Sequence, residues 1–462
     1  MKSLPLSVLA RVLGSGPVEG PDRSIAGVST DTRTIRAGDC FFALAGENFD
    51  GHNYVREAFA KGAACAVVER AVEGVGAGDR PVLRVPDTVR ALGDLAREYR
   101  RMAGFRVVAI TGSVGKTTTR QIVHHVLSRR FRVHQASKSF NNHIGLPLTL
   151  LGAGPETEIV VAELGANHPG EIAALTRIAR PDIALVTNAH PAHLEGFGDL
   201  ATIVREKLSI ADGLSDTGIL IVNADIEPLV ATCRKMGRPF RTFGKSAGMD
   251  YRAEQVSCGA LSSSFAVEGV EVRLPLPGPG NVENALAAWA VCSQFGVTVN
   301  DFGEALASLS GVSMRAEALQ IDGLTVLNDC YNANPASMRN ALAMLHNLRS
   351  GDEANRSRRL VFICGPMAEL GPQTEALHAD LGRAVAEAGV DLFVAVGGPT
   401  QTTAQAAQET AHHNLQTRSY PDTASVCRGM QEFLQPDDIV LVKGSRTARL
   451  ERVVQELIKD CG

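Results

Sequence analysis

Aromatic side chains and a surplus of charge of one sign are both scarce in this sequence of 462 residues. Only 5% of the residues are aromatic, and 46 basic against 50 acidic side chains give a formal net charge of −4. Nucleic-acid surfaces are usually basic, and platforms for single strands need aromatic side chains for stacking. We therefore expect no nucleic-acid partner.

Long apolar runs and paired cysteines are missing as well. No stretch reaches the roughly 18 apolar residues that a membrane-spanning helix requires. Arg11 interrupts the apolar stretch near the start and no small-residue cleavage site follows, so residues 1–16 predict an amphipathic helix rather than a signal peptide. The nine cysteines are scattered, odd in number and never spaced C-x-x-C, which argues against a disulfide framework. The sequence thus predicts a cytoplasmic protein that does not span a membrane.

Short apolar β-rich runs that alternate with helical patterns are abundant. Near-continuous apolar runs are typical of a parallel sheet covered on both faces. Apolar residues at 122, 123, 126 and 127 follow a helical period. In the middle of the chain we expect strands at 106–111, 158–164, 181–188 and 218–225, with a helix at 117–130.

A second α/β unit follows residue 315, and shorter strand-like pieces precede residue 86. The expected strands are 324–330, 359–365, 391–397 and 438–444 in the later unit, and 39–46 and 63–69 in the earlier one. Helices are expected at 89–103 and 374–389. The length suits about three domains of ordinary size. We expect an α/β fold of three consecutive α/β domains, at 1–86, 87–313 and 314–462.

The motif richest in chemical meaning is VVAITGSVGKTTT, residues 107–119. It resembles a phosphate-binding loop between a strand and a helix, but its first glycine is Gly112 where the usual spacing would place it at Ile110. Backbone N–H groups of residues 111–116 could surround a phosphate, Lys116 could reach the outer phosphates, and Thr117 could bind Mg²⁺. A plain glycine turn is the alternative.

Several further motifs appear in a familiar order: NNHIGLPLTLL (141–151), ELGANHPGEI (163–172), HLEGFG (193–198), GNVENALAA (280–288), SMRAE (313–317), NDCYNANPASM (328–338), GPMAELG (365–371) and LVKGSR (441–446). Together with STDTRTIRAGDCFFALAGENFDGH (29–52), they resemble the Mur ligases of bacterial peptidoglycan synthesis. In that family the two-residue gap between the glycines is normal. The motifs cover all three expected domains.

The resemblance implies a fold and a reaction. It implies an N-terminal UDP-sugar domain, a central P-loop ATPase-like parallel sheet, and a C-terminal Rossmann-like domain that binds the incoming dipeptide. A substrate carboxylate would accept the γ-phosphate of ATP, and an amine would then attack the acyl phosphate. ELGANHPGEI and YNANPASM are typical of the member that joins D-Ala-D-Ala to UDP-N-acetylmuramoyl-tripeptide. ATP and two Mg²⁺ ions are the implied cofactors.

Catalytic and metal-binding roles follow from the same resemblance. Glu163 ends an apolar strand and His193 precedes LEGFG, and both are implied metal ligands with Thr117. Lys207 corresponds to a lysine that CO₂ carbamylates into a metal ligand, a reaction that needs a deprotonated amine. Relatives often have Gly-Glu where Leu208-Ser209 stands here. The implied catalytic residues are Lys116, His193, Lys207 and Arg315, and the implied metal ligands are Thr117, Glu163, His193 and Lys207.

The implied nucleotide site joins the loop to residues from later motifs. Asn284 would face the adenine, Asn281 would support the loop, and Asp329 would hold the ribose hydroxyls. Two departures stand out, since Gly280 replaces a common family histidine and Met314 replaces a glycine before Arg315. The full set comprises Thr111, Gly112, Ser113, Val114, Gly115, Lys116, Thr117, Thr118, Asn281, Asn284, Arg315 and Asp329.

Substrate contacts are also carried over by resemblance. The candidates are Ser29, Thr30, Asp31 and Arg33 for the UDP-sugar, Asn141 and Asn142 for the muramoyl-peptide, and Asn332, Asn334 and Ser337 for D-Ala-D-Ala. Asn-Pro at 334–335 is equally a good turn without any ligand. We expect a monomer.

Two other functions stay open. The first is another acyl-phosphate ligase of the superfamily, either an earlier Mur ligase or a folylpolyglutamate synthase. The Asp-Asn-Pro triplet of the tripeptide-forming Mur enzyme is absent, which disfavours that relative. The second is a P-loop switch or motor that hydrolyses ATP without a small-molecule acceptor.

Overall fold

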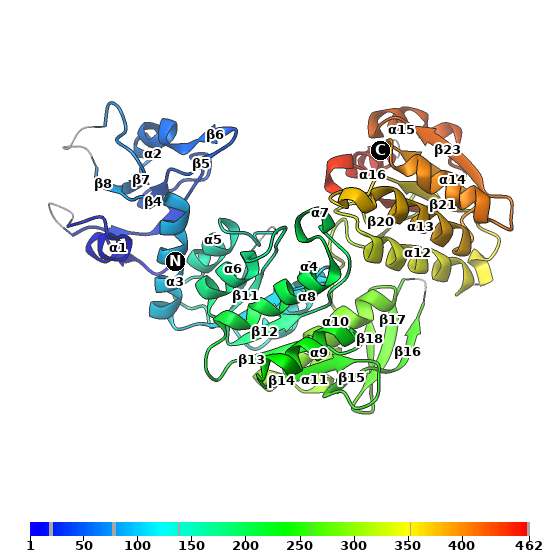
Figure 1. Ribbon diagram of the computed structural model, residues 1–462, viewed down its shortest axis with the longest axis horizontal. Helices are drawn as coiled ribbons and strands as arrows, with labels where there is room; N and C mark the ends of the chain where they lie inside the picture. The colour runs from blue at the N-terminus through cyan, green and yellow to red at the C-terminus, as the bar shows by residue number, and fades with distance from the viewer. Residues whose placement is uncertain (18–21, 76–79, 137–138, 260, 352, 460–462) are drawn as a thin grey trace.

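The computed structural model describes residues 1–17, 22–75, 80–136, 139–259, 261–351 and 353–459. The chain forms three lobes that follow one another in sequence, each built around a largely parallel sheet (Figure 1). The expected α/β class and three-domain architecture are confirmed. None of the described helices is long and apolar enough to cross a membrane.

The first lobe contains a small parallel sheet in the order β3-β4-β7-β8. The predicted strand 39–46 is wrong as a single element. After β4 the chain leaves the sheet, and β5 pairs with β6 in a separate antiparallel hairpin closed by a Gly51 N–H to Leu44 carbonyl bond of 2.8 Å. The elements are α1 (Leu6–Leu13), β3 (Gly27–Ser29), β4 (Asp39–Phe42), β5 (Ala45–Gly46), β6 (Phe49–Asp50), α2 (Val55–Ala60), β7 (Cys65–Val68) and β8 (Val82–Arg84).

Helix α3 (Thr88–Ala103) leads into the second lobe. The Asp87 carboxylate caps its first turn by accepting from the Arg90 N–H, and Gly104 ends it in the left-handed conformation. The central sheet is parallel throughout, in the order β10-β11-β9-β12-β13-β14-β15. Its strands are β9 (Arg106–Thr111), β10 (Val133–Gln135), β11 (Ile159–Glu163), β12 (Ile183–Val186), β13 (Ile219–Asn223), β14 (Phe240–Gly244) and β15 (Tyr251–Arg252).

Both faces of the central sheet are covered, which explains its continuous apolar strands. Val107 and Ala109 pack in one core, while Val108 and Ile110 pack in the core on the opposite face. An antiparallel sheet of β16 (Glu254–Cys258), β17 (Ser263–Val267) and β18 (Val270–Leu274) contributes to the second core. The helices are α4 (Lys116–Leu127), α5 (Gly145–Gly152), α6 (Glu171–Ala179), α7 (Leu194–Phe197), α8 (Leu200–Leu208), α9 (Glu227–Met236), α10 (Pro279–Cys292) and α11 (Val299–Leu306).

The third lobe has a sheet in the order β19-β20-β24-β21-β22-β23, parallel except for the edge strand β19. Helix α12 lies on the side of this lobe that faces the central lobe (Figure 1). Its elements are β19 (Glu317–Ile321), β20 (Leu324–Asn328), α12 (Pro335–Ser350), β21 (Leu360–Cys364), α13 (Thr374–Glu387), β22 (Leu392–Val396), α14 (Thr400–Thr410), β23 (Gln416–Tyr420), α15 (Thr423–Gly429), β24 (Ile439–Lys443) and α16 (Glu451–Lys459).

The second and third lobes touch near α7 and at the start of α10. Near α7, the Glu195 N–H donates to the Glu369 carbonyl at 3.1 Å, and the His193 imidazole contacts the Glu369 carboxylate. At the start of α10, a Cβ placed on Gly278 would lie 2.4 Å from Met344 Cγ of α12. The space between these contacts is the candidate site.

Candidate active site

The phosphate-type loop leaves the central strand β9 and enters α4. Gly112 has φ +149° and Gly115 has φ +84°, conformations that side chains rarely adopt. A Cβ on Gly112 would lie 2.0 Å from Thr187 Oγ1, and one on Gly115 would lie 2.0 Å from Asn284 Oδ1. Both glycines are therefore required by close packing as well as by backbone shape.

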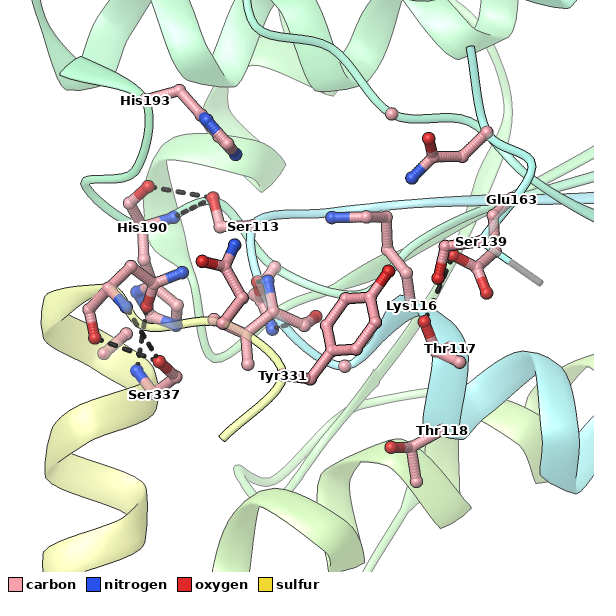
Figure 2. A pocket seen from close by; sticks show the side chains of 18 of the residues that line it. Ser113, Lys116, Thr117, Thr118, Ser139, Glu163, His190, His193, Tyr331 and Ser337 are labelled. Carbon is pink, nitrogen blue, oxygen red and sulfur yellow. Dashed lines mark hydrogen bonds between the residues drawn. The ribbon is translucent and has the colours of Figure 1, made fainter. Parts of the chain in front are cut away.

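The segment after β12 holds the apex of this loop. The Asn188 carboxamide accepts from the Val114 N–H at 2.9 Å and donates to the Val114 carbonyl at 3.1 Å, and Thr187 Oγ1 donates to the same carbonyl at 2.7 Å. Ser113 N–H donates to the Asn188 carbonyl, and Ser113 Oγ bonds the backbone of His190 (Figure 2). The Ser113 and Val114 N–H groups are thus engaged with protein, contrary to the expectation that they face a phosphate.

The first N–H groups of α4 remain the natural phosphate donors, since the first turn of a helix has no intrahelical acceptors for them. Lys116 Nζ donates to the Gly112 carbonyl at 2.6 Å, which folds the side chain back over the loop. Burial, opposed by the nearby Glu163 carboxylate, lowers the pKa of Lys116 to about 8. A bound phosphate would favour the charged form of this lysine.

Glu163, at the end of β11, lies beside the helix start. Its carboxylate accepts from Thr117 Oγ1 at 3.2 Å and lies 3.1 Å from the Arg120 guanidinium. The side chains of Arg120 and Glu163 are only 3% and 2% exposed. Arg120 also donates to the Ala136 carbonyl at 2.9 Å, so it links the carboxylate to the loop before Asn141.

His193 and Lys207 approach the loop from α7 and α8. Lys207 is 2% exposed, and its ammonium lies 5.4 Å from the centre of the Phe197 ring. Burial and the nearby Lys116 charge lower the pKa of Lys207 to about 7. Burial also lowers the pKa of His193.

In the described chain no three His, Cys, Asp or Glu side chains form a ready-made metal cluster. Among the predicted metal ligands, Thr117 and Glu163 are in contact, and the Lys207 charge acts on His193.

Arg315 reaches the pocket from the third lobe. Its guanidinium lies 4.1 Å from the centre of the Tyr331 ring, which orients it by cation–π attraction. Met314 and Ala316 on either side have φ +59° and +53°. The left-handed backbone at Met314 gives a physical reason for the glycine that relatives have there.

Asp329 follows β20, and both of its carboxylate oxygens are engaged. One accepts from the Ala316 N–H at 3.1 Å and the other from Lys443 Nζ at 2.6 Å. Lys443 is 2% exposed in its side chain and also donates to the Asn332 carbonyl at 3.0 Å. Asp329 thus stands at the pocket as the centre of a network that fixes the Arg315 and Asn332 loops.

Several side chains that were predicted to contact ligands form hydrogen bonds with the local backbone. The Asn142 carboxamide oxygen accepts from the N–H groups of Ile144 and Gly145, at the start of α5. Asn334 and Ser337 form a reciprocal capping box at the start of α12. All three still line the pocket, together with Asn141 and Asn332.

Asn281 and Asn284 lie on the first turns of α10. Asn281 donates to the Pro277 carbonyl at 2.8 Å, Asn284 donates to Asn281 at 3.4 Å, and Thr119 Oγ1 donates to Asn284 at 3.3 Å. At Gly280 a Cβ would lie 2.8 Å from Asn340 Nδ2 of α12, so a side chain here, such as the histidine of relatives, would displace the Asn340 carboxamide.

The residues predicted for the UDP-sugar lie apart from this pocket, in the first lobe. Ser29 Oγ caps a turn at Asp31, and the Asp31 carboxylate pairs with Arg33 at 2.6 Å, which lowers the pKa of Asp31 to about 2. Thr30 precedes this turn. None of the four lines the large pocket.

The pocket itself has a volume of about 1370 Å³ and lies between the second and third lobes. Small-molecule pockets usually measure about 300–1000 Å³, so this one has room for more than one ligand. Lys116, Thr117, Glu163, His193, Asn284, Arg315 and Asp329 line it together. Lys207 lies just behind this surface and is not among the lining residues.

Sequence reasoning missed several residues that shape the site. Asn188 is the last residue of the predicted strand 181–188, at the sheet's carboxyl edge where α/β sites gather, and that position was a usable signal. Lys443 lies in the quoted LVKGSR motif. For Arg120 and Asn340 no local pattern distinguishes them from ordinary helix residues.

Comparisons with known proteins agree with this geometry. Three family descriptions match: "Mur ligase family, catalytic domain" over residues 24–100, "Mur ligase middle domain" over 110–292, and "Mur ligase, glutamate ligase domain" over 314–446. The UDP-N-acetylmuramoyl-tripeptide–D-alanyl-D-alanine ligase of Escherichia coli is 36% identical over 99% of both chains. A crystal structure of MurF from Acinetobacter baumannii superposes with a TM-score of 0.87, at 32% identity over 98% of both chains. MurF from Thermotoga maritima, solved with ADP, gives 0.80 at 28% identity over 94% of this chain and 97% of its own.

Proposed function

Because this chain belongs to the Mur ligase family, we propose that it joins D-Ala-D-Ala to UDP-N-acetylmuramoyl-tripeptide at the expense of ATP. The E. coli relative that carries this activity in its name matches nearly the full length of both chains. The observation that supports the assignment best is the shared pocket, which the Lys116 loop and the Asn332–Ser337 segment line from opposite lobes. A phosphorylated substrate held by one lobe is thereby within reach of an amine held by the other.

The reaction proceeds through an acyl phosphate. An oxygen of the tripeptide's terminal carboxylate attacks the γ-phosphorus of ATP, and the bond to ADP breaks. The amine of D-Ala-D-Ala then attacks the activated carbonyl and loses a proton, and the tetrahedral intermediate expels inorganic phosphate to leave a peptide bond. Such phosphoryl transfer depends on positioning and on positive charge around the phosphates.

Lys116 and Arg315 provide that charge from the two lobes. The α4 N-terminus with residues Gly115 to Thr118 binds the outer phosphates, with Gly112 and Thr111 shaping the turn. Arg315, oriented by Tyr331, reaches the phosphates from the third lobe. Ser113 and Val114 contribute by holding the loop in shape. The ADP complex of the T. maritima relative supports nucleotide binding in this fold.

The chemistry of the donors fits Mg²⁺, which prefers oxygen ligands. Thr117 and Glu163 present a hydroxyl and a carboxylate in contact, and in Figure 2 the Lys116 side chain lies between them and His193. Mg²⁺ bound there would neutralise developing phosphate charge. Lys207 is buried with a pKa lowered to about 7, which suits conversion to a carbamate by CO₂ and hence to an anionic ligand for a second ion.

Substrate sites are distributed over the three lobes, which we delimit as 1–86, 87–313 and 314–462. The first binds the UDP-sugar near Ser29, Thr30, Asp31 and Arg33, and Asn141 and Asn142 contact the muramoyl-peptide. Asn332, Asn334 and Ser337 bind D-Ala-D-Ala. We propose that the chain acts as a cytoplasmic monomer; all eight described cysteines are free, which suits a reducing compartment.

A substrate-dependence assay tests the function. Phosphate release from ATP is expected to require UDP-N-acetylmuramoyl-tripeptide and to rise strongly when D-Ala-D-Ala is added. Turnover supported equally by L-glutamate or D-glutamate would favour a folylpolyglutamate synthase or an earlier Mur ligase instead. Release without any acceptor would favour an ATP-driven switch.

A further inference from the structure

The first turns of α10 and the second turn of α12 meet at the edge of the pocket, and three asparagines gather there. Asn281 and Asn284 belong to α10, and Asn340 belongs to α12 of the third lobe. All three line the pocket beside the Gly115 turn of the phosphate-type loop. The three asparagines therefore lie on the wall of the pocket that adjoins the phosphate-type loop.

Two of these carboxamides are already committed to the protein. Asn281 donates to the Pro277 carbonyl and accepts from Asn284, and Asn284 accepts from Thr119. Asn284 also packs against the Gly115 turn, where a Cβ would lie 2.0 Å from its Oδ1. Most of their hydrogen-bonding atoms therefore bond to other protein groups and hold α10 against the loop.

Asn340 differs from both. Within the described ranges its carboxamide has no hydrogen-bond partner, and it is neither fully buried nor fully exposed. The carboxamide approaches α10 so closely that a Cβ on Gly280 would lie 2.8 Å from Nδ2 and 3.3 Å from Cγ. The missing side chain at Gly280 thus gives this carboxamide its place at the pocket edge.

From this arrangement we infer that Asn340 recognises the adenine of the nucleotide, a role that rests on the proposed use of ATP. A carboxamide has one acceptor and one donor side by side. Adenine presents the matching pair, an exocyclic N6 amino group and a neighbouring ring nitrogen acceptor. On the edge that carries N7, hypoxanthine presents two acceptors, O6 and N7, in place of adenine's N6 donor and N7 acceptor, so that edge mismatches the same carboxamide. Two residues of the third lobe would therefore bind the nucleotide. Asn340 would contact the base, and Arg315 would contact the phosphates.

Calorimetric binding of ADP and inosine diphosphate to the full chain tests this inference. The wild type is expected to bind ADP about tenfold more tightly than inosine diphosphate, the scale of one or two hydrogen bonds. Asn340→Ala is expected to lose most of that factor for ADP and to bind both nucleotides within about twofold of each other. Asn347→Ala, a matched change two turns further along α12 and outside this pocket, should behave like the wild type.

A second variant repeats the test without touching α12. Gly280→Ala adds a methyl group in a helical first turn, where alanine is well accommodated, and displaces the Asn340 carboxamide. It should reduce the preference for ADP as Asn340→Ala does. An unchanged ratio of the two affinities in either variant overturns the inference. A wild-type chain that binds neither nucleotide would instead remove the proposed use of ATP.

Discussion

Arg120 and Glu163 form an ion pair that is almost fully buried, with Arg120 Nε 3.1 Å from Glu163 Oε1. The pair joins α4 to the end of β11 directly beneath the proposed phosphate site. Buried pairs contribute little net stability, but removing one partner leaves an uncompensated charge in a low-dielectric setting. The Glu163 carboxylate is therefore held in place by its neighbour before any metal ion arrives.

Arg120→Met is expected to destabilise the central lobe by about 3–5 kcal/mol. Urea unfolding followed by fluorescence measures this, since Trp289 is the only tryptophan and lies buried in α10. Arg120→Met combined with Glu163→Gln should cost less than the sum of the single changes. Arg101→Met, in the exposed pair with Glu98, serves as control and should change stability far less than Arg120→Met. Equal effects of the buried and exposed changes would contradict this interpretation.

Asn188 braces the nucleotide loop, and its removal should loosen that loop. Asn188→Ala deletes two hydrogen bonds to Val114 and leaves the Val114 N–H without its acceptor. We expect ADP affinity to fall roughly tenfold, the scale of two lost hydrogen bonds. Faster amide exchange in the peptide spanning residues 112–117 should accompany the loss. Weaker binding with an unchanged exchange rate would indicate that Asn188 acts on the ligand directly.

The sequence predicted the inner strands of the two larger sheets, because each of them is an apolar run that a covered parallel sheet demands, but it missed edge strands such as β10, β19 and β23. Val107 to Ile110 illustrate this, since both alternating faces of β9 are buried. The hairpin strands β5 and β6 were missed because two-residue strands carry no periodicity. The antiparallel sheet of β16 to β18 was missed as well, since β16 is mostly exposed.

The candidate site was predictable only where reactive residue types stand at the spacing of a known motif, as Lys116 and Thr117 do in the phosphate-type loop. Asn334 and Ser337 show the limit, since the same polar atoms that suit a ligand also cap α12. Asn188 and Lys443 act through backbone groups of distant loops, as Asn188 does on Val114. Local sequence can mark such a position, as the strand end does for Asn188, but the partner is set by the tertiary fold.

Lys116→Ala is expected to reduce kcat by roughly 100-fold or more, the scale of one preorganised electrostatic group. A variant within about threefold of the wild type would mean that this loop does not carry the chemistry.

The pKa of Lys116 gives a second, independent readout. In the free protein its pKa is about 8, so above pH 8 the side chain is mostly neutral. Bound phosphates favour the charged form and raise this pKa, so nucleotide binding at pH 9 should take up a proton that Lys116→Ala does not take up. Below about pH 7 the ammonium is already formed and the uptake by this group should vanish. Calorimetry in buffers of different ionisation enthalpy measures the difference.

Closure of the third lobe onto the second is expected when all ligands bind. The pocket of about 1370 Å³ exceeds the usual range for small-molecule sites, and Arg315 and Lys116 approach it from opposite lobes. Closure would also exclude water from an acyl phosphate. X-ray scattering should therefore show a smaller radius of gyration with tripeptide substrate and a non-hydrolysable ATP analogue than without them. An unchanged radius would argue for a fixed arrangement of the lobes.

Lys207 is expected to act as a carbamate. Its pKa of about 7 leaves much of the amine neutral at pH 7 and above, and CO₂ reacts only with the neutral amine. As the pH falls below 7 the amine becomes protonated, so the carbamate and the activity that depends on it should be lost on the acid side. Removing CO₂ and bicarbonate at pH 8 should lower activity, and restoring bicarbonate should recover it.

Lys207→Ala separates a carbamate from an ordinary ammonium. The variant should lose most activity, and small acids such as acetate or formate should partly restore it by occupying the vacated anionic position. An unmodified ammonium would give the opposite pattern, because short amines would then restore activity and acids would not. The space that Lys207 leaves beside Phe197 is buried, so a rescuing molecule has to be small. Rescue by amines alone, or a fully active variant, would show that Lys207 contributes no anion to the site.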